Sequence, residues 1–190
     1  MKHRFDPSKK HVLDSPARHQ HTRPQELLAW AGITANQSLL DFGCGTGFFT
    51  VPAARLLGPG GKVLATDIHP EMLAAVRAAV TTQGLDNVEI FPTPEDDLLL
   101  SAPVDWVLLA FVLHEVSQPA QLLALAHKLT AQTGRILVVE WPQEAASHGP
   151  PLKVRLSPEQ ILSLAQPLGL VEVQRQQRPP HYYALVLKKS

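Results

Sequence analysis

The stretch SLLDFGCGTG, residues 38–47, decides the fold of this chain. It begins as a short apolar strand, passes through an acidic residue and enters three alternating glycines, Gly43, Gly45 and Gly47. Glycines at this spacing let the backbone turn sharply and lie against a ligand, because they carry no Cβ atom. A helix is expected to follow over 46–57, and the first N–H groups of a helix have no partner within it. The stretch therefore predicts a loop that binds a nucleotide cofactor.

A second acidic residue, Asp67, ends the next predicted strand, about twenty residues after the glycines. A carboxylate at the end of a strand can accept two hydrogen bonds from a ribose diol, so an adenosyl cofactor is predicted. The dinucleotide fingerprint G-x-G-x-x-G requires a further glycine where this chain has Phe48. The pattern therefore disfavours NAD, and a nicotinamide reductase is kept only as an alternative.

From Pro24 onward, expected strands alternate with expected helices, which is typical of a parallel sheet covered by helices on both faces. The inner strands are near-continuous apolar runs, as expected for parallel strands buried on both sides. After the first strand at 38–41, strands are expected at 63–65, 88–91, 107–110, 136–139, 170–176 and 182–188, and helices at 46–57, 70–82, 119–129 and from Ser157 to near Gly169.

The spacing Asp41-x-Gly43-x-Gly45-x-Gly47 resembles the first motif of the class I S-adenosylmethionine-dependent methyltransferases. Asp67 matches the ribose-binding acid of that family. The resemblance continues in the family's order through 93–96, 104–116 and 135–141. It implies S-adenosyl-L-methionine as the cofactor and a Rossmann-like α/β fold, in which a seven-stranded, mostly parallel sheet has helices on both faces and ends in an antiparallel hairpin.

The resemblance also implies the residues that hold the cofactor. Ile68 is expected to flank the adenine, and Asp41 to orient the glycine loop and the cofactor amino group, although a simple turn carboxylate is the alternative. Thr93 stands where the family more often has an acid for the adenine amino group. Thr93, the backbone of Pro94 and Glu95, or the Glu95 side chain can replace that acid. Ala110, in the segment where family members close over the methionine end of the cofactor, completes the set.

His114 follows the fourth expected strand and is the best candidate for a catalytic base, since an unperturbed histidine has a pKa near 6.5. Methyl transfer from a sulfonium needs no protonation of the leaving group, so positioning alone supplies much of the acceleration. Lining of the site and a structural hydrogen bond therefore remain alternatives for His114. Cys44 is interpreted as a packing residue. No metal is predicted, because the nine histidines lack the close spacing of a zinc site.

The flanks, including 5–7, 13–18, 140–141 and 149–158, resemble small bacterial methyltransferases related to the ubiquinone/menaquinone and arsenite methyltransferases. Cysteine clusters that would capture arsenic are absent, which argues against arsenite. The predicted function is methyl transfer to an unidentified small-molecule acceptor. The alternative is a non-catalytic S-adenosylmethionine-binding regulatory or scaffold protein.

The amino-acid composition argues against nucleic acids and membranes as partners. The 190 residues contain 17 Lys and Arg and 17 Asp and Glu, and this balance removes the long-range attraction of basic proteins to nucleic acids and anionic membranes. The longest apolar stretch, 104–113, is far shorter than the ~20 residues of a membrane helix. A single cysteine and no apolar signal segment favour a cytoplasmic location. We expect a tail or active-site lid at 1–24 and one methyltransferase domain at 25–190; the oligomeric state is not predicted.

Overall fold

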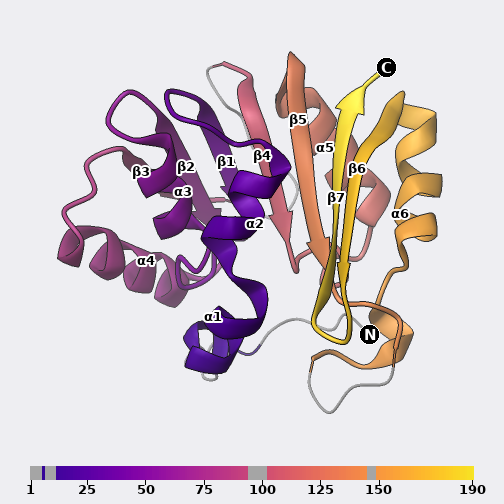
Figure 1. The fold of residues 1–190 in the computed structure, drawn as a ribbon, viewed down its shortest axis with the longest axis horizontal. Coiled ribbons are helices and arrows are strands. Elements are labelled where there is room, and N and C mark those ends of the chain that lie inside the picture. The colour runs from indigo at the N-terminus through magenta and orange to yellow at the C-terminus, as the bar shows by residue number, and fades with distance from the viewer. Residues whose placement is uncertain (1–5, 7–11, 94–101, 145–148) are drawn as a thin grey trace.

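The computed structural model describes residues 6, 12–93, 102–144 and 149–190 (Figure 1). Its centre is a seven-stranded sheet with the order β3-β2-β1-β4-β5-β7-β6. The first five strands are parallel, whereas β7 runs antiparallel to both β5 and β6. This arrangement confirms the predicted fold class and the terminal hairpin. The strands are β1 (Ser38–Phe42), β2 (Lys62–Asp67), β3 (Val88–Pro92), β4 (Val104–Ala110), β5 (Thr130–Glu140), β6 (Leu170–Arg178) and β7 (Tyr182–Lys189).

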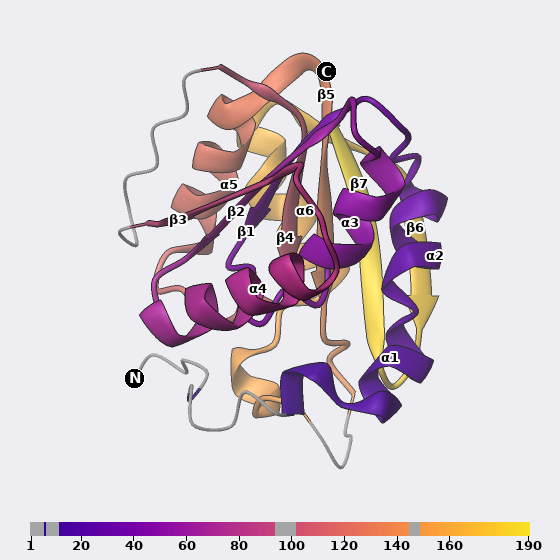
Figure 2. The same cartoon turned by 90° about the vertical axis from the view of Figure 1, so that its left-hand side faces the viewer.

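Helices cover both faces of the sheet, as the alternating pattern predicts. Figure 2 shows α5 on one side and α2 and α3 on the other. Among the described residues, no helix has the length and apolar character needed to cross a membrane. The helices are α1 (Pro16–Thr22), α2 (Pro24–Ala31), α3 (Thr50–Leu57), α4 (Pro70–Thr82), α5 (Pro119–Leu129) and α6 (Pro158–Ala165), with short 3-10 turns at Leu152–Val154 and Gln166–Leu168.

The inner strands contain near-continuous apolar runs because consecutive side chains enter different cores. Leu39 belongs to the cluster beneath α2 and α3, whereas Leu40 belongs to the cluster beneath α5 and α6. Both side chains are fully buried. Val107 and Leu108 divide in the same way on β4. A strand with two buried faces therefore loses the polar alternation of a half-exposed strand.

Helix α3 begins at Thr50 and not at Thr46, so the predicted start was wrong by about one turn. Gly47 has a φ of +91°, which a right-handed helix excludes. A Cβ atom at Gly47 would lie 2.5 Å from Cγ2 of Val76 on α4, so the loop also packs too closely for any larger residue. Close packing against α4 thus extends the glycine loop and delays the helix.

Two segments lie beyond the carboxyl ends of the parallel strands. Figures 1 and 2 both place α1 there and not against a face of the sheet. Residues 149–157, which precede α6, lie at the same end in Figure 1. Helix α6 begins with a capping box: the Ser157 hydroxyl accepts from the Gln160 N–H, and the Ser157 N–H donates to the Gln160 side chain.

Candidate functional site

A cavity of about 680 Å³ opens at the carboxyl ends of β1, β2 and β4, where parallel α/β sheets bind their ligands. Helix α1 and the segment after β5 also contribute to its wall. Two predicted residues, Pro94 and Glu95, lie outside the described part of the chain. Gly47 is turned toward α4 and does not line this cavity. The predicted residues that do line it are Asp41, Gly43, Gly45, Asp67, Ile68, Thr93, Ala110 and His114.

The Asp67 carboxylate joins the end of β2 to the glycine loop. Its Oδ2 accepts a hydrogen bond from the Gly45 N–H at 3.0 Å, and its Oδ1 accepts from the His69 N–H at 2.9 Å. Each oxygen of an ionised carboxylate has a second lone pair, so two acceptor positions remain for a ligand. The contact with His69, the residue before α4, shows that Asp67 also supports the start of that helix. Its structural role is therefore compatible with the predicted role at a ribose.

Asp41 is buried and lies behind the glycine loop. Its Oδ2 accepts a hydrogen bond from the Thr50 hydroxyl at 2.6 Å, which ties β1 to the start of α3. Burial raises the pKa of Asp41 to about 7; the hydrogen bond from Thr50 opposes this rise, and the charge of Asp67 adds to it. With a pKa of about 7, the Asp41 carboxyl changes charge near neutral pH. Its hydrogen bond with Thr50 joins the end of β1 to the start of α3.

Three buried hydroxyls face this region without a hydrogen-bond partner among the described residues. They belong to Thr46, Thr66 and Thr93, and all three residues line the cavity. Buried polar atoms in native proteins are nearly always paired, so a ligand with hydrogen-bonding edges suits this wall. Ile68, 38% exposed, supplies an apolar surface beside them that suits the face of an adenine ring.

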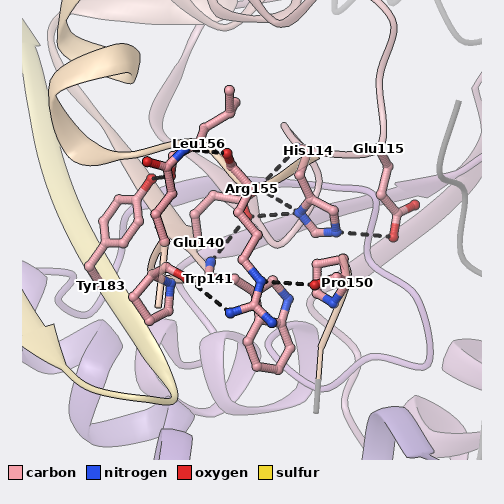
Figure 3. Close-up of polar contacts among 10 residues, drawn as sticks. His114, Glu115, Glu140, Trp141, Pro150, Arg155, Leu156 and Tyr183 are labelled. Carbon is pink, nitrogen blue, oxygen red and sulfur yellow. Dashed lines mark hydrogen bonds and ion pairs between the residues drawn. The ribbon is translucent and has the colours of Figure 1, made fainter. Parts of the chain in front are cut away.

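His114 is paired with Glu140 across the ends of β4 and β5 (Figure 3). Its Nδ1 lies 2.8 Å from Oε2 and 3.1 Å from Oε1 of Glu140, whose side chain is fully buried. Glu140 also accepts from the backbone N–H groups of His114 and Trp141, both at 3.2 Å. These contacts hold the imidazole and the carboxylate in one orientation.

The pKa of His114 is raised above 6.5. Burial alone would lower the pKa, but the charge and hydrogen bond of Glu140, together with the charge of Glu115, outweigh burial, while Arg155 opposes them. The other ring nitrogen, Nε2, lies 3.8 Å from Oε1 of Glu115. Sequence reasoning missed Glu140 as a site residue; its only signal was an acidic residue at the end of an apolar strand.

Two aromatic rings form another wall of the cavity. Phe111 follows β4 in the left-handed region, with φ of +59°, and its ring lies 5.2 Å from that of Trp141. A strained φ at a non-glycine residue is frequent where side chains are aimed into a functional site. Neither residue was predicted to belong to the site.

Arg155 fastens the segment that carries Trp141 (Figure 3). Its guanidinium donates to the carbonyl oxygens of Pro142, Glu144 and Pro150 at 2.9–3.0 Å and lies over the Trp141 ring at 5.6 Å. One buried side chain therefore holds the described residues on either side of 145–148.

Cys44 is confirmed as a packing residue. It is buried with Ala65, Leu73 and Val76, and burial raises the pKa of its thiol well above the usual range. A reactive thiolate is thus disfavoured at this position.

Comparison with known proteins identifies similar chains. A family model described as a methyltransferase domain matches residues 40–136. A ubiquinone/menaquinone biosynthesis C-methyltransferase UbiE from Marinomonas sp. is 31% identical over 125 residues, which are 62% of this chain and 47% of that protein. The UbiE protein of Hahella chejuensis is 34% identical over 119 residues, 58% of this chain and 45% of its own length. The chain spans about half the length of these curated relatives.

Solved structures extend the similarity over the whole fold. A SAM-dependent methyltransferase from Aquifex aeolicus has a TM-score of 0.89 and 27% identity, covering 97% of this chain and 98% of that one. The [4+2]-cyclase SpnF has a TM-score of 0.75 with 16% identity, covering 88% and 80%. The similarity to SpnF concerns the fold alone. A cyclase with this fold shows that the architecture is not restricted to one reaction.

Replacement of Asp41 by Asn is expected to remove a pH dependence of stability. The folded-state pKa of Asp41, about 7, lies above that of an unfolded aspartate, so its contribution to stability is lost as pH rises through 7. Relative to Asp41→Asn, the wild-type free energy of unfolding should fall by about 2 kcal/mol between pH 5 and pH 8. Urea unfolding at both pH values measures the difference, with the exposed Asp86→Asn as control. Parallel pH profiles for wild type and Asp41→Asn would contradict the assignment.

Proposed function

The chain belongs to the methyltransferase domain family, and we propose that it transfers a methyl group from S-adenosylmethionine to a small-molecule acceptor whose proton is taken by His114. The observation that carries the proposal is the meeting, in one cavity, of the glycine loop, the Asp67 carboxylate and His114, whose ring is paired with the buried Glu140. The first two suit an adenosyl cofactor. The third is a proton acceptor at the ends of the neighbouring strands.

The residues present fit the cofactor. Asp67 has acceptor positions for the ribose hydroxyls, Ile68 offers an apolar surface for adenine, and the free hydroxyl of Thr93 suits the adenine edge. At Gly43, an added Cβ would approach Val112 to 3.1 Å, so the loop leaves little room for any side chain beside the ligand. When bound, S-adenosylmethionine supplies an electrophilic methyl group on a positively charged sulfur.

Glu140 prepares His114 for proton transfer. In the neutral imidazole, the Nδ1 proton is donated to Glu140, which leaves the lone pair of Nε2 as the acceptor. A hydroxyl of the acceptor molecule transfers its proton to Nε2, and its oxygen keeps the electron pair. The buried Glu140 carboxylate then stabilises the imidazolium. The fraction of enzyme ready to accept a proton therefore increases as pH rises through the pKa of His114.

The aromatic wall and the named relatives support a planar acceptor. Phe111 and Trp141 offer ring faces against which an aromatic molecule packs well. For a phenol-like acceptor, loss of the hydroxyl proton makes both the oxygen and a conjugated ring carbon nucleophilic, so the same base serves O- and C-methylation. The names of the UbiE relatives favour carbon as the atom methylated. We propose a small acidic aromatic hydroxyl compound, and not a nucleic acid, as the acceptor, and a cytoplasmic site of action.

The direct test is turnover. We expect release of S-adenosylhomocysteine when the protein is incubated with S-adenosylmethionine and a panel of phenols and hydroquinones. His114→Gln should lower kcat about 10²-fold or more, because it removes the proton acceptor. Binding of S-adenosylhomocysteine should stay within about twofold of wild type, since Asp67 and the glycine loop are unchanged. Tight cofactor binding without turnover across the panel would favour the scaffold alternative instead.

Replacement of Asp67 by Ala should weaken binding of S-adenosylhomocysteine by roughly 10- to 100-fold in calorimetry, equal to about 1.5–3 kcal/mol for lost hydrogen bonds to a charged group. Asp67→Asn should lose less, because its amide oxygen still accepts one bond. Asp86→Asn serves as the control on the surface, and thermal unfolding checks that each variant folds. Unchanged affinity in Asp67→Ala would remove the ribose assignment.

Replacement of Glu140 by Gln should move the acid limb of kcat/KM to lower pH, because the carboxylate that raises the pKa of His114 is gone while burial remains. Wild-type activity should fall as pH drops through a pKa above 6.5. Glu115→Gln, which removes the more distant carboxylate, should shift the limb less. An acid limb that stays in place in Glu140→Gln would show that His114 is not the titrating base.

A further inference from the structure

Helix α1 brings an arginine to the cavity, and this residue has no role in the site described above. Arg18 lines the cavity and is half-buried. Its Nη1 donates to the carbonyl oxygen of Leu13 at 2.6 Å, which is the only side-chain hydrogen bond of Arg18 within the described part of the chain. The nearby Asp14 is paired with His19 instead. A guanidinium has five N–H donors, so most of them are left for another partner.

Aromatic rings hold the guanidinium in place. Cζ of Arg18 lies 4.2 Å from the centre of the Phe48 ring and 5.2 Å from that of Phe111. Phe48 follows the glycine loop and Phe111 follows β4, so Arg18 lies where these two parts of the site meet. Such cation–π contacts fix the position of the charge, but they supply no hydrogen-bond acceptor for its N–H groups.

The charge of Arg18 is costly in this position. Burial lowers the pKa of Arg18 to about 10, with Asp14 acting in the opposite direction, so the side chain remains protonated at neutral pH. The acids that line the cavity are Asp6, Asp41, Asp67 and Glu115. Asp41 bonds to Thr50, Asp67 accepts from backbone N–H groups, and Glu115 lies 3.8 Å from His114. A half-buried cation with unused donors is most stabilised by an oxyanion, which arginine binds through paired hydrogen bonds.

We propose that Arg18 binds a carboxylate inside this cavity and thereby ties helix α1 to the bound ligand. The inference rests on the cofactor site proposed above. Two sources supply this chemistry: the amino-acid carboxylate of S-adenosylmethionine and a carboxylate on the acceptor. The cofactor is favoured, because its adenosyl end is assigned to Asp67, Ile68 and Thr93, whereas Arg18 lies over the start of the glycine-loop helix and the end of β4.

The same helix also contacts the turn between β6 and β7. His21, one turn after Arg18, stacks on His181 of the β6–β7 hairpin, with ring centres 3.9 Å apart and planes 11° apart. Both histidines line the cavity. A ligand carboxylate on Arg18 would therefore add a second attachment to the one that the histidine pair gives this helix. This arrangement gives helix α1 the role of a lid.

The test compares two ligands that differ only in this group. Decarboxylated S-adenosylmethionine keeps the adenosine, sulfonium and amino group of S-adenosylmethionine. Calorimetry of wild type and Arg18→Met should show about 10- to 100-fold weaker binding of S-adenosylmethionine in the variant, and a change below about twofold for the decarboxylated ligand. Arg18→Lys should lie between them, because a point charge lacks the planar fork. Arg55→Met, on the exposed side of α3, is the matched control.

Amide hydrogen exchange supplies a second readout. S-adenosylmethionine should slow exchange in α1 of the wild type, whereas the decarboxylated ligand, or the Arg18→Met variant, should lose that protection. If both ligands lose affinity equally in Arg18→Met, Arg18 has only a structural role and the proposal is overturned. If neither loses affinity, a raised KM confined to carboxylated acceptors supports the acceptor as the source, and an unchanged KM overturns the proposal. Failure of both ligands to bind wild type refutes the cofactor site itself.

Discussion

The hydrogen bond from the Gly45 N–H to the Asp67 carboxylate joins the loop after β1 to the end of β2, and the rest of the site is arranged around it. It requires a backbone that turns with positive φ immediately after a buried strand, which the glycines permit. It also requires β1 and β2 to be adjacent and parallel, so that both end at the same edge. Core packing on both faces of the sheet thus sets the place at which polar groups meet.

The neighbouring pair of strands repeats this principle with different chemistry. The register of β4 and β5 pairs Ala110 with Val139, so Phe111 and Glu140 leave the sheet side by side. Four residues of turn after β4 are enough to bring His114 back onto Glu140. A carboxylate that is fully buried needs such a partner, because an isolated charge would be expensive to desolvate. The strained Phe111 belongs to the same turn and helps to form the aromatic wall.

Elements outside the sheet close the cavity and contribute two arginines, whereas the ends of the strands contribute acidic side chains. Helix α1 contributes Arg18, and Arg155 holds the segment that carries Trp141. The two arginines are contrasted by their partners: Arg155 donates to three backbone carbonyls, whereas Arg18 donates to one. The first is bonded within the protein, and the second has donors left for a ligand. Arg155 therefore supports the wall of the cavity, whereas Arg18 is suited to binding a ligand.

The sequence alone specified the order of the strands and of the helices after β1, the glycine loop, Asp67 and the terminal hairpin, because each depends on a local pattern of apolar spacing, turn residues and strand ends. It did not predict helices α1 and α2. It placed the start of α3 too early, since the extension of the loop depends on contact between Gly47 and Val76 of another helix. Only the tertiary structure decided the His114–Glu140 pair, the Asp41–Thr50 contact and the position of Arg18 over Phe48 and Phe111. Those contacts join separate elements, and no local periodicity records which side chains the packed sheet will bring together.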